Sequence, residues 1–181
     1  MLIDEERINL NGHEILLRSA KTEDAQILID YLRTVCGETR FLMKESDEVN
    51  LTVEQEISFI ERHNRASDSL LILAFFDGEY AGNCSFDGGG ESRRNAHRAG
   101  IGIALYQKYT GHGIGRILMD RMIKCAKKLG YEQMELTVVQ GNERAIGLYK
   151  SVGFEECGRI PDANKYDDGT YADDIFMIKK L

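Results

Sequence analysis

The sequence predicts a mixed α/β fold in a single domain. Short runs of aliphatic and aromatic residues, typical of strands, alternate along the chain with segments whose apolar residues recur at helical spacing. The 181 residues suit one domain, and the chain has no internal repeat, low-complexity tract or proline-rich linker. We therefore expect residues 1–181 to form one domain.

The N-terminal quarter predicts a strand followed by two helices. Residues 14–18 form a short apolar run that we take as the first strand. Thr22 can cap the next helix, whose inner side is indicated by the spacing of Ala25, Leu28, Ile29 and Leu32. A second helix is expected over residues 52–66, with Ile57 and Ile60 facing inward.

A hairpin and a further strand are expected in the middle of the chain. Residues 69–76 and 80–86 resemble strands, and Asp77-Gly78 between them is typical of a tight hairpin turn. Three glycines at 88–90 indicate a loop. Residues 97–106 form a continuous apolar stretch, which favours a strand buried on both faces.

The C-terminal half contains the strongest helical pattern of the chain. The apolar residues of this helix lie at 3,1,4,3,4 spacing, and Gly130 ends it as a C-terminal cap; they are Ile114, Ile117, Leu118, Met122, Cys125 and Leu129. A strand over 132–139, a short helix over 142–152 and a strand from Phe154 follow. The turn at 167–169 then introduces a last strand that runs through Met177.

Composition excludes several classes of function. The net charge of −7 disfavours a nucleic-acid partner, because binding to a phosphate backbone depends on Lys and Arg. No segment approaches the roughly 18 consecutive apolar residues of a membrane span, and the N-terminus lacks a signal-peptide pattern. The four cysteines are widely scattered and predict free thiols, not a metal site. We expect a cytoplasmic protein without metal and without a membrane partner.

The glycine-rich segment Thr110-Gly-His-Gly-Ile-Gly-Arg116 lies between a predicted strand and a predicted helix. Glycine lets the backbone approach a ligand closely. The first amides of a helix have no internal partner, and the helix dipole favours negative charge there. The pattern therefore predicts a phosphate cradle. The alternative is a tight connection that needs glycine only for its positive φ, which accounts for one glycine more readily than for three.

Two common phosphate-binding motifs do not fit this segment. A Walker loop requires Gly-Lys-Ser/Thr, and no lysine follows these glycines. The dinucleotide-binding fingerprint requires a glycine where Arg116 stands. We expect a different pyrophosphate-containing ligand.

Two motifs of the C-terminal half resemble the GNAT superfamily of acetyl-CoA-dependent N-acetyltransferases. Its motif A, Arg/Gln-x-x-Gly-x-Gly/Ala, matches residues 110–115 except that Thr110 occupies the first position. Its motif B, Asn-x-x-Ala-x-x-x-Tyr followed by Gly-Phe, matches Asn142, Ala145, Tyr149, Gly153 and Phe154. With the C-terminal pattern, the resemblance covers roughly the last 85 residues. The N-terminal half agrees in its order of elements.

The resemblance implies a mixed, splayed central sheet flanked by helices, with acetyl-CoA as cosubstrate. The strand residues Ile103, Ala104 and Leu105 would pair through their backbone with the pantetheine arm and the acetyl carbonyl. Asn142 would contact the pantetheine arm. The pyrophosphate would be held by Gly111, His112, Gly113, Ile114, Gly115 and Arg116.

Catalysis needs an acid and a base. Tyr149 would lie beside the sulfur, where its hydroxyl could protonate the departing thiolate; the alternative is a helix tyrosine with a buried ring. Relatives carry a base at positions equivalent to Gly100 and Thr137, which are not bases here. Glu135 shares a strand face with Thr137 and is our candidate base, against the alternative of a salt-bridged surface carboxylate.

The resemblance predicts transfer of an acetyl group to a primary amine by direct attack in a ternary complex. The amine could belong to a small molecule or to a protein N-terminus or lysine. The lack of a carboxylate at positions 100 and 137 supports the alternative of a non-catalytic acyl-CoA-binding or sensor domain. Tyr149 argues for the enzyme. The acceptor's identity and a homodimeric assembly both stay open.

Overall fold

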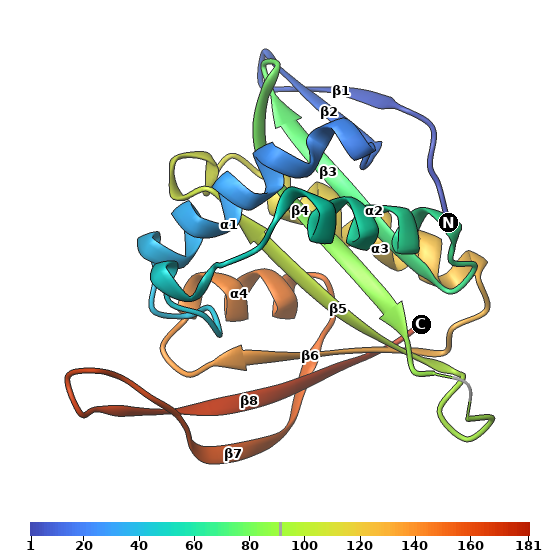
Figure 1. Cartoon of the computed structure of the whole chain (residues 1–181). Coiled ribbons are helices and arrows are strands. Elements are labelled where there is room, and N and C mark those ends of the chain that lie inside the picture. The colour runs from blue at the N-terminus through green and yellow to red at the C-terminus, as the bar shows by residue number, and fades with distance from the viewer. Residues whose placement is uncertain (91) are drawn as a thin grey trace. The chain divides into compact units, whose positions relative to one another are not determined.

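A computed structural model describes residues 1–90 and 92–181. It confirms the mixed α/β class, with a strand order of β1-β2-β3-β4-β5-β6-β8-β7 and four α-helices (Figure 1). The contacts divide the chain into two compact units, residues 1–87 with 102–122 and residues 88–101 with 123–181. The expectation of a single domain stays a prediction.

The first unit is built on antiparallel strands. β1 (Glu6–Leu10) pairs with β2 (His13–Ser19), β2 with β3 (Ser69–Phe76), and β3 with β4 (Glu79–Gly88). The bounds of β3 match the prediction, and the predicted first strand is β2. β1 is an additional strand that its sequence did not reveal, because its charged and polar residues alternate with only two partly buried apolar ones.

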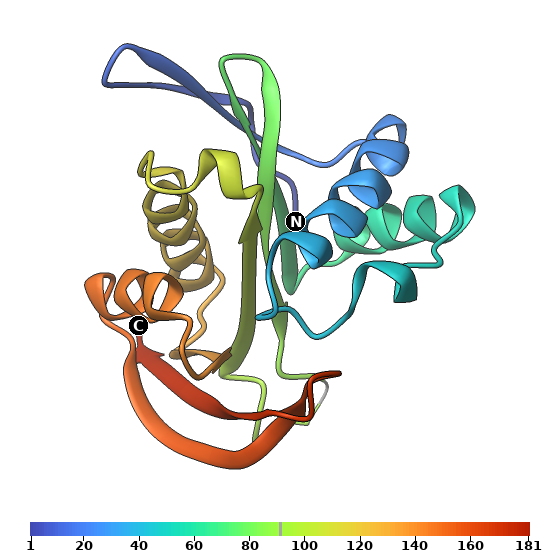
Figure 2. The same ribbon diagram turned by 90° about the vertical axis from the view of Figure 1, so that its left-hand side faces the viewer.

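Two helices cover one face of this unit. α1 (Ala25–Glu38) and α2 (Val53–Arg65) lie on the same side of β3 and β4 in Figure 2, and the first turns of α3 (Ile114–Lys128) lie on the other side. A core of buried residues joins the two helices to β3 and β4; it includes Leu28, Tyr31, Val35, Ile60, Leu71, Leu73 and Tyr80. At 25 cal/mol per Å² of apolar area, each such side chain contributes roughly 2 kcal/mol to folding.

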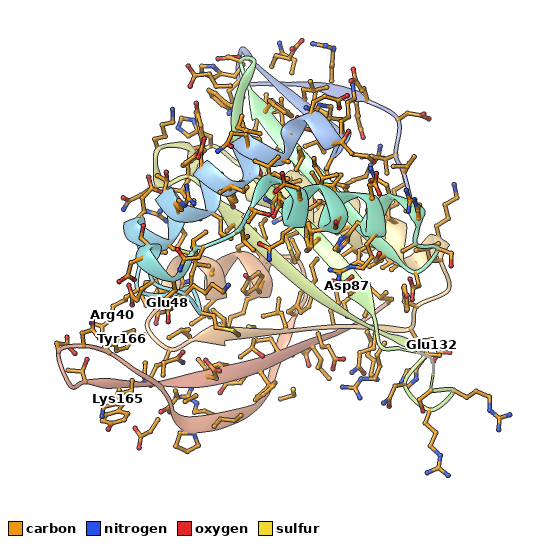
Figure 3. The ribbon with its side chains drawn as sticks, in the orientation of Figure 1. Arg40, Glu48, Asp87, Glu132, Lys165 and Tyr166 are labelled. Atoms are coloured by element: carbon orange, nitrogen blue, oxygen red, sulfur yellow. The ribbon has the colours of Figure 1, made fainter. Side chains whose placement is uncertain are left out.

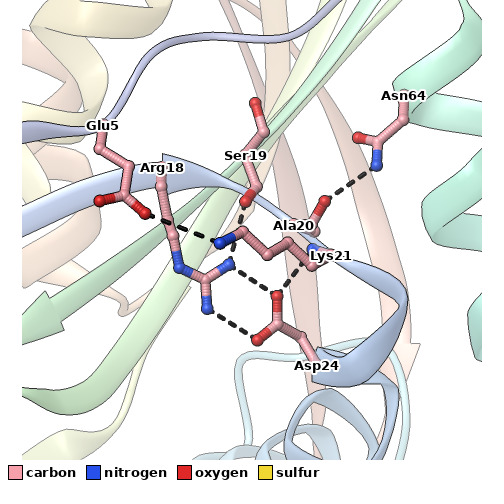
Figure 4. Close-up of polar contacts among 7 residues, drawn as sticks. All are labelled: Glu5, Arg18, Ser19, Ala20, Lys21, Asp24 and Asn64. Atoms are coloured by element: carbon pink, nitrogen blue, oxygen red, sulfur yellow. Dashed lines mark hydrogen bonds and ion pairs between the residues drawn. The ribbon is translucent and has the colours of Figure 1, made fainter.

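The junction between β2 and α1 is fixed by one ion pair. Arg18 donates two hydrogen bonds of 2.7 Å to the carboxylate of Asp24, which also accepts from the amide of Lys21 (Figure 4). Asn64 of α2 donates to the carbonyl of Ala20 at 2.8 Å. Thr22 is not the cap that we predicted: it begins a 3-10 turn (Thr22–Asp24), and the Asp24 side chain satisfies the Lys21 amide.

Local sequence signals are confirmed where they involve caps and turns. The predicted start of the second helix at Thr52 is confirmed: Thr52 is the N-cap of α2, in a capping box with Gln55 that was not predicted. Asp77 and Gly78 both have positive φ, of 48° and 85°, as a tight type I′ hairpin turn requires. Gly130 follows α3 with φ 86°.

The second unit contains β6 (Gln133–Val139), α4 (Glu143–Ser151), and the hairpin of β7 (Glu155–Lys165) and β8 (Tyr171–Lys180). β6 pairs antiparallel with β8, and β8 with β7. The start of β5 (Arg98–Leu105) pairs in parallel with β6 at three positions, from Arg98↔Gln133 to Gly100↔Glu135. All these elements were predicted within a few residues.

The prediction that β5 is buried on both faces is wrong. Ala99 and Ile101 are buried, whereas Gly100 and Gly102 are exposed, and Ile103 to Leu105 are half-buried. An added Cβ at Gly100 or Gly102 would have no heavy atom within 4 Å. The continuous apolar run led to a wrong prediction of burial because it includes Gly100 and Gly102, which contribute no side chain to a core.

Candidate active site

The glycine turn has the geometry of an anion cradle. Gly111 and Gly113 have φ of +84° and +85°, which L side chains adopt only with strain. α3 begins at Ile114. The Ile117 amide donates a hydrogen bond of 3.2 Å to the Gly113 carbonyl, in the first turn of the helix. The amides before Ile117 therefore lack an intrahelical partner. Gly111 and Gly113 therefore meet a requirement for positive φ, whereas Gly115 lies within the helix.

In the turn, Ile114 is buried and most of the other residues are exposed. Ile114 is 1% exposed and fixes the helix start in the core. Gly111, His112, Gly113 and Arg116 are exposed. Arg116 belongs to the first turn of α3, and its guanidinium lies 3.6 Å from the carboxylate of Asp120 in an i,i+4 ion pair. The arrangement favours an anionic ligand.

The two hairpins of the first unit brace the turn. A Cβ at Gly113 would lie 3.1 Å from the Leu10 side chain at the end of β1. The ring of His112 lies 5.0 Å from Phe76 and 6.4 Å from His13, measured between centroids. The Nδ1 atom of His13 contacts Asp77 at 2.6 Å. Sequence reasoning did not foresee that residues 10–13 and 76–77 contact the turn, because these contacts join distant segments.

The end of β5 is held by three interactions with the same unit. The Tyr31 hydroxyl donates to the Ala104 carbonyl at 2.6 Å, the Tyr106 amide donates to Ala81, and the Gln107 amide donates to Glu38. Gly82, with φ +145°, allows this approach, because a Cβ there would lie 2.4 Å from the Ala104 carbonyl oxygen. Ile103, Ala104 and Leu105 are thus presented by a fixed backbone.

The second unit contains Asn142 and Tyr149. The Asn142 side-chain oxygen accepts from the Ala145 amide at 3.3 Å and so caps α4. Tyr149 is 7% exposed, and its ring lies 6.1 Å from that of Phe154. Motif B therefore supplies a helix cap and a packed aromatic pair.

Glu135 forms an ion pair with Arg98. Arg98 donates from Nε at 3.0 Å and from Nη2 at 2.5 Å to the two carboxylate oxygens, and this hydrogen bond raises the pKa of Arg98. Glu135 and Thr137 lie on the strand face opposite the buried Met134, Leu136 and Val138, as the alternation predicted. Both carboxylate oxygens are engaged by Arg98, so any catalytic role of Glu135 has to be separated from its ion pair.

Asp173 and the backbone of His97 are engaged in structural contacts. The carboxylate of Asp173 accepts from the Asp162 amide at 3.1 Å and pairs with Arg159 at 3.4 Å. The His97 carbonyl accepts from the amides of Glu132 and Gln133. These contacts explain Asp173 without reference to a substrate.

Among residues 1–90 and 92–181, no three His, Cys, Asp or Glu side chains gather closely enough to hold a metal ion. Within the same residues, no helix is long and apolar enough to cross a membrane.

The fold and the turn define the class of α/β proteins in which a glycine-rich turn leads into a helix N-terminus, a geometry that favours an anion. A family model described as the acetyltransferase (GNAT) family matches residues 30–154, more than half of the chain. The chain belongs to this acyltransferase family, as the two motifs predicted.

Similar sequences and solved structures agree with this family assignment. The chain is 33% identical over 111 residues to the L-amino acid N-acetyltransferase AaaT of Escherichia coli, a match that covers 60% of this chain and 66%, just under two thirds, of that enzyme. It is 25% identical to an L-methionine sulfoximine/L-methionine sulfone acetyltransferase of Pseudomonas paraeruginosa over 91% of this chain and 94% of the relative. A GNAT-family acetyltransferase structure from Streptococcus pneumoniae superposes with a TM-score of 0.87 at 28% identity, covering 93% and 100% of the two chains.

Proposed function

We propose that this protein transfers the acetyl group of acetyl-CoA to a primary amine by direct attack within a ternary complex. The observation that carries the proposal is the turn at residues 110–116, which presents unpaired helix amides and exposed glycines to an anion. The family membership supports coenzyme A as the ligand that carries this anionic group. Two relatives named for acetylation of amino acids or their analogues favour a small-molecule amine.

The residues take four roles in this proposal. The turn residues 111–116 hold the pyrophosphate, the backbone of residues 103–105 meets the pantetheine arm and the acetyl carbonyl, and Asn142 contacts the pantetheine. Tyr149 donates a proton to the departing thiolate. The amine nitrogen bonds to the acetyl carbon as the carbon–sulfur bond breaks, and the ammonium proton leaves to a base. We place the protein in the cytoplasm, where its four cysteines stay reduced.

The experiment that tests this function follows free thiol release from acetyl-CoA. Purified protein is supplied with a panel of L-amino acids, their amides, L-methionine sulfone and simple monoamines. We expect thiol release that depends on one group of amines, with the N-acetylated product identified by mass spectrometry. Tight acetyl-CoA binding without turnover on any amine or peptide N-terminus would instead support a non-catalytic acyl-CoA sensor, the alternative that Gly100 and Thr137 favour.

We propose Glu135 as the base, and two variants separate this role from its ion pair. Glu135→Gln and Arg98→Gln both break the ion pair, but only Glu135→Gln removes the carboxylate. We expect Glu135→Gln to lower kcat/KM by about 10-fold or more near pH 7 and to regain part of it at pH 9, where free amine is more abundant.

Arg98→Gln should retain most of the activity at both pH values, because the proton acceptor is still present. The measurement is the pH profile of kcat/KM for each variant with the best amine of the panel. Identical profiles for the two variants would show that Glu135 acts only through its ion pair, and deprotonation would then fall to another group.

A further inference from the structure

The segment at residues 109–113, which leads into α3, contains two residues in the left-handed region. Gly111 and Gly113 have φ of +84° and +85°. Glycine adopts positive and negative φ about equally, so it loses more conformational freedom than other residues when it is ordered. Ordering such a segment at the moment of binding would weaken the affinity for a ligand. A segment of this kind therefore binds tightly when other contacts already fix its conformation.

One aromatic ring contacts this segment on both sides of Gly111. The ring centroid of Phe76 lies 5.5 Å from that of Tyr109 and 5.0 Å from that of His112. Both distances fall in the range over which aromatic rings attract one another. Phe76 ends β3 and is half-buried. A side chain more than 30 residues away in the sequence thus holds the residues that precede and follow Gly111.

The first residue of β4 holds the start of the same segment. The Tyr109 hydroxyl donates a hydrogen bond to the carboxylate of Glu79, and the Lys108 ammonium donates to that carboxylate at 3.1 Å. Tyr109 is therefore bonded to β4 through its hydroxyl while its ring contacts Phe76 at the end of β3. The tip of the β3–β4 hairpin holds the segment by a polar and an apolar contact.

This tip is itself braced by the neighbouring β1–β2 hairpin. The ring of His13 lies 4.5 Å from that of Phe76, and its Nδ1 atom contacts the carboxylate of Asp77 at 2.6 Å. The Glu14 amide donates to the Asp77 carboxylate at 2.8 Å, and the Asp77 amide donates to the Glu14 carbonyl at 2.9 Å. Phe76 thus belongs to a fixed cluster that joins two hairpins.

The other end of the β3–β4 hairpin is anchored beside α2. Figure 3 shows Asp87 near the end of β4, and the Nε2 atom of His63 lies 3.3 Å from its carboxylate. Leu71 and Leu73 of β3 are buried in the core that includes residues of α1 and α2. Because protein cores are close-packed, strands anchored in this way have little freedom to move. The hairpin therefore presents Phe76 from a rigid base.

We propose that Phe76 is a positioning residue that holds residues 109–113 in their anion-binding conformation before acetyl-CoA binds. If the segment were ordered in only a fraction of the molecules, the apparent Kd would rise in inverse proportion to that fraction. Phe76 thereby sets the affinity for acetyl-CoA without touching the reacting atoms. This inference rests on the proposed binding of acetyl-CoA at the turn and does not require that an amine be acetylated.

The first test compares two phenylalanines of the same unit. Phe76→Leu removes the ring and keeps an apolar side chain. We expect the Kd for acetyl-CoA, measured by isothermal titration calorimetry, to rise about 3- to 10-fold, as it would if about a third to a tenth of the molecules were competent to bind. The KM for acetyl-CoA should rise with it, while kcat at saturating acetyl-CoA stays unchanged.

Phe59→Leu is the matched control. Phe59 is also half-buried and packs against the core, but its ring contacts are with His63 and Arg62 of its own helix. Its replacement should leave the affinity for acetyl-CoA unchanged, even if it lowers the melting temperature as much as Phe76→Leu does. Equal losses of affinity in the two variants, or wild-type affinity in a folded Phe76→Leu protein, would overturn the proposal.

The second test asks whether the ring acts through the turn. Phe76→Tyr keeps the ring and should bind acetyl-CoA with nearly wild-type affinity. In a His112→Ala background, Phe76→Leu should weaken binding less than it does in the wild type, because one of the two ring contacts is already lost. Full additivity of the two substitutions, or a Phe76→Tyr protein as weak as Phe76→Leu, would exclude the positioning role. A wild type that binds acetyl-CoA but acetylates no amine would contradict the proposed function alone, and these affinities would still decide the role of Phe76.

Discussion

Replacing Gly113 by glutamate is expected to lower the affinity for acetyl-CoA by about 100-fold or more, as the loss of two charge-assisted hydrogen bonds would do. Gly113 has φ +85°, and a Cβ there lies 3.1 Å from Leu10, so the new side chain distorts the turn. It also places a carboxylate at the helix N-terminus, where it competes with the pyrophosphate for the free amides of α3. The measurement is isothermal titration calorimetry with acetyl-CoA.

Two controls separate charge from strain and from misfolding. Gly113→Ala introduces the same backbone strain without the carboxylate, so a smaller loss of affinity is expected. Gly130→Glu makes the same substitution at the other end of α3, where φ is +86° and a Cβ meets nothing within 4 Å. That variant should bind acetyl-CoA normally. A folded Gly113→Glu protein with wild-type affinity would mean that the pyrophosphate is bound elsewhere.

Removing the Tyr149 hydroxyl is expected to reduce kcat by about 10- to 1,000-fold with little change in acetyl-CoA affinity. The ring is 7% exposed and packs near Phe154, so phenylalanine can occupy the same space and retain the fold. Expulsion of the thiolate would then proceed without a proton donor. The measurement is single-turnover kinetics with a verified amine acceptor, so that the chemical step is observed directly.

Tyr131→Phe is the control, because it deletes a phenol three residues after the end of α3, outside motif B. It should retain the wild-type rate. Tyr149→Phe turning over at the wild-type rate under single-turnover conditions would exclude the hydroxyl from thiolate departure. A loss of acetyl-CoA affinity equal to the loss of rate would instead identify Tyr149 as a binding residue.

Local signals in the sequence determined most of the fold. The 3.6-residue periodicity located α1, α2 and α3 because an amphipathic helix carries its pattern within a single segment. The helix start at Thr52, the Asp77-Gly78 turn and Gly130 were predicted correctly because each is a hydrogen-bonding or φ requirement met within a few residues. The spacing of motifs A and B identified the family, which the match over residues 30–154 confirmed.

The partners of individual side chains were decided by tertiary structure. Arg98 and Glu135 are 37 residues apart, and Tyr31 and Ala104 are 73 apart, so no local pattern indicates their bonds. β1 went unpredicted because an edge strand with few apolar residues depends on its neighbour for stability. Glu56 is buried, although glutamate is rarely buried unless it is paired. Sequence determines which backbone conformations are favourable, whereas the pairing and desolvation of a charge depend on the long-range contacts that folding brings about.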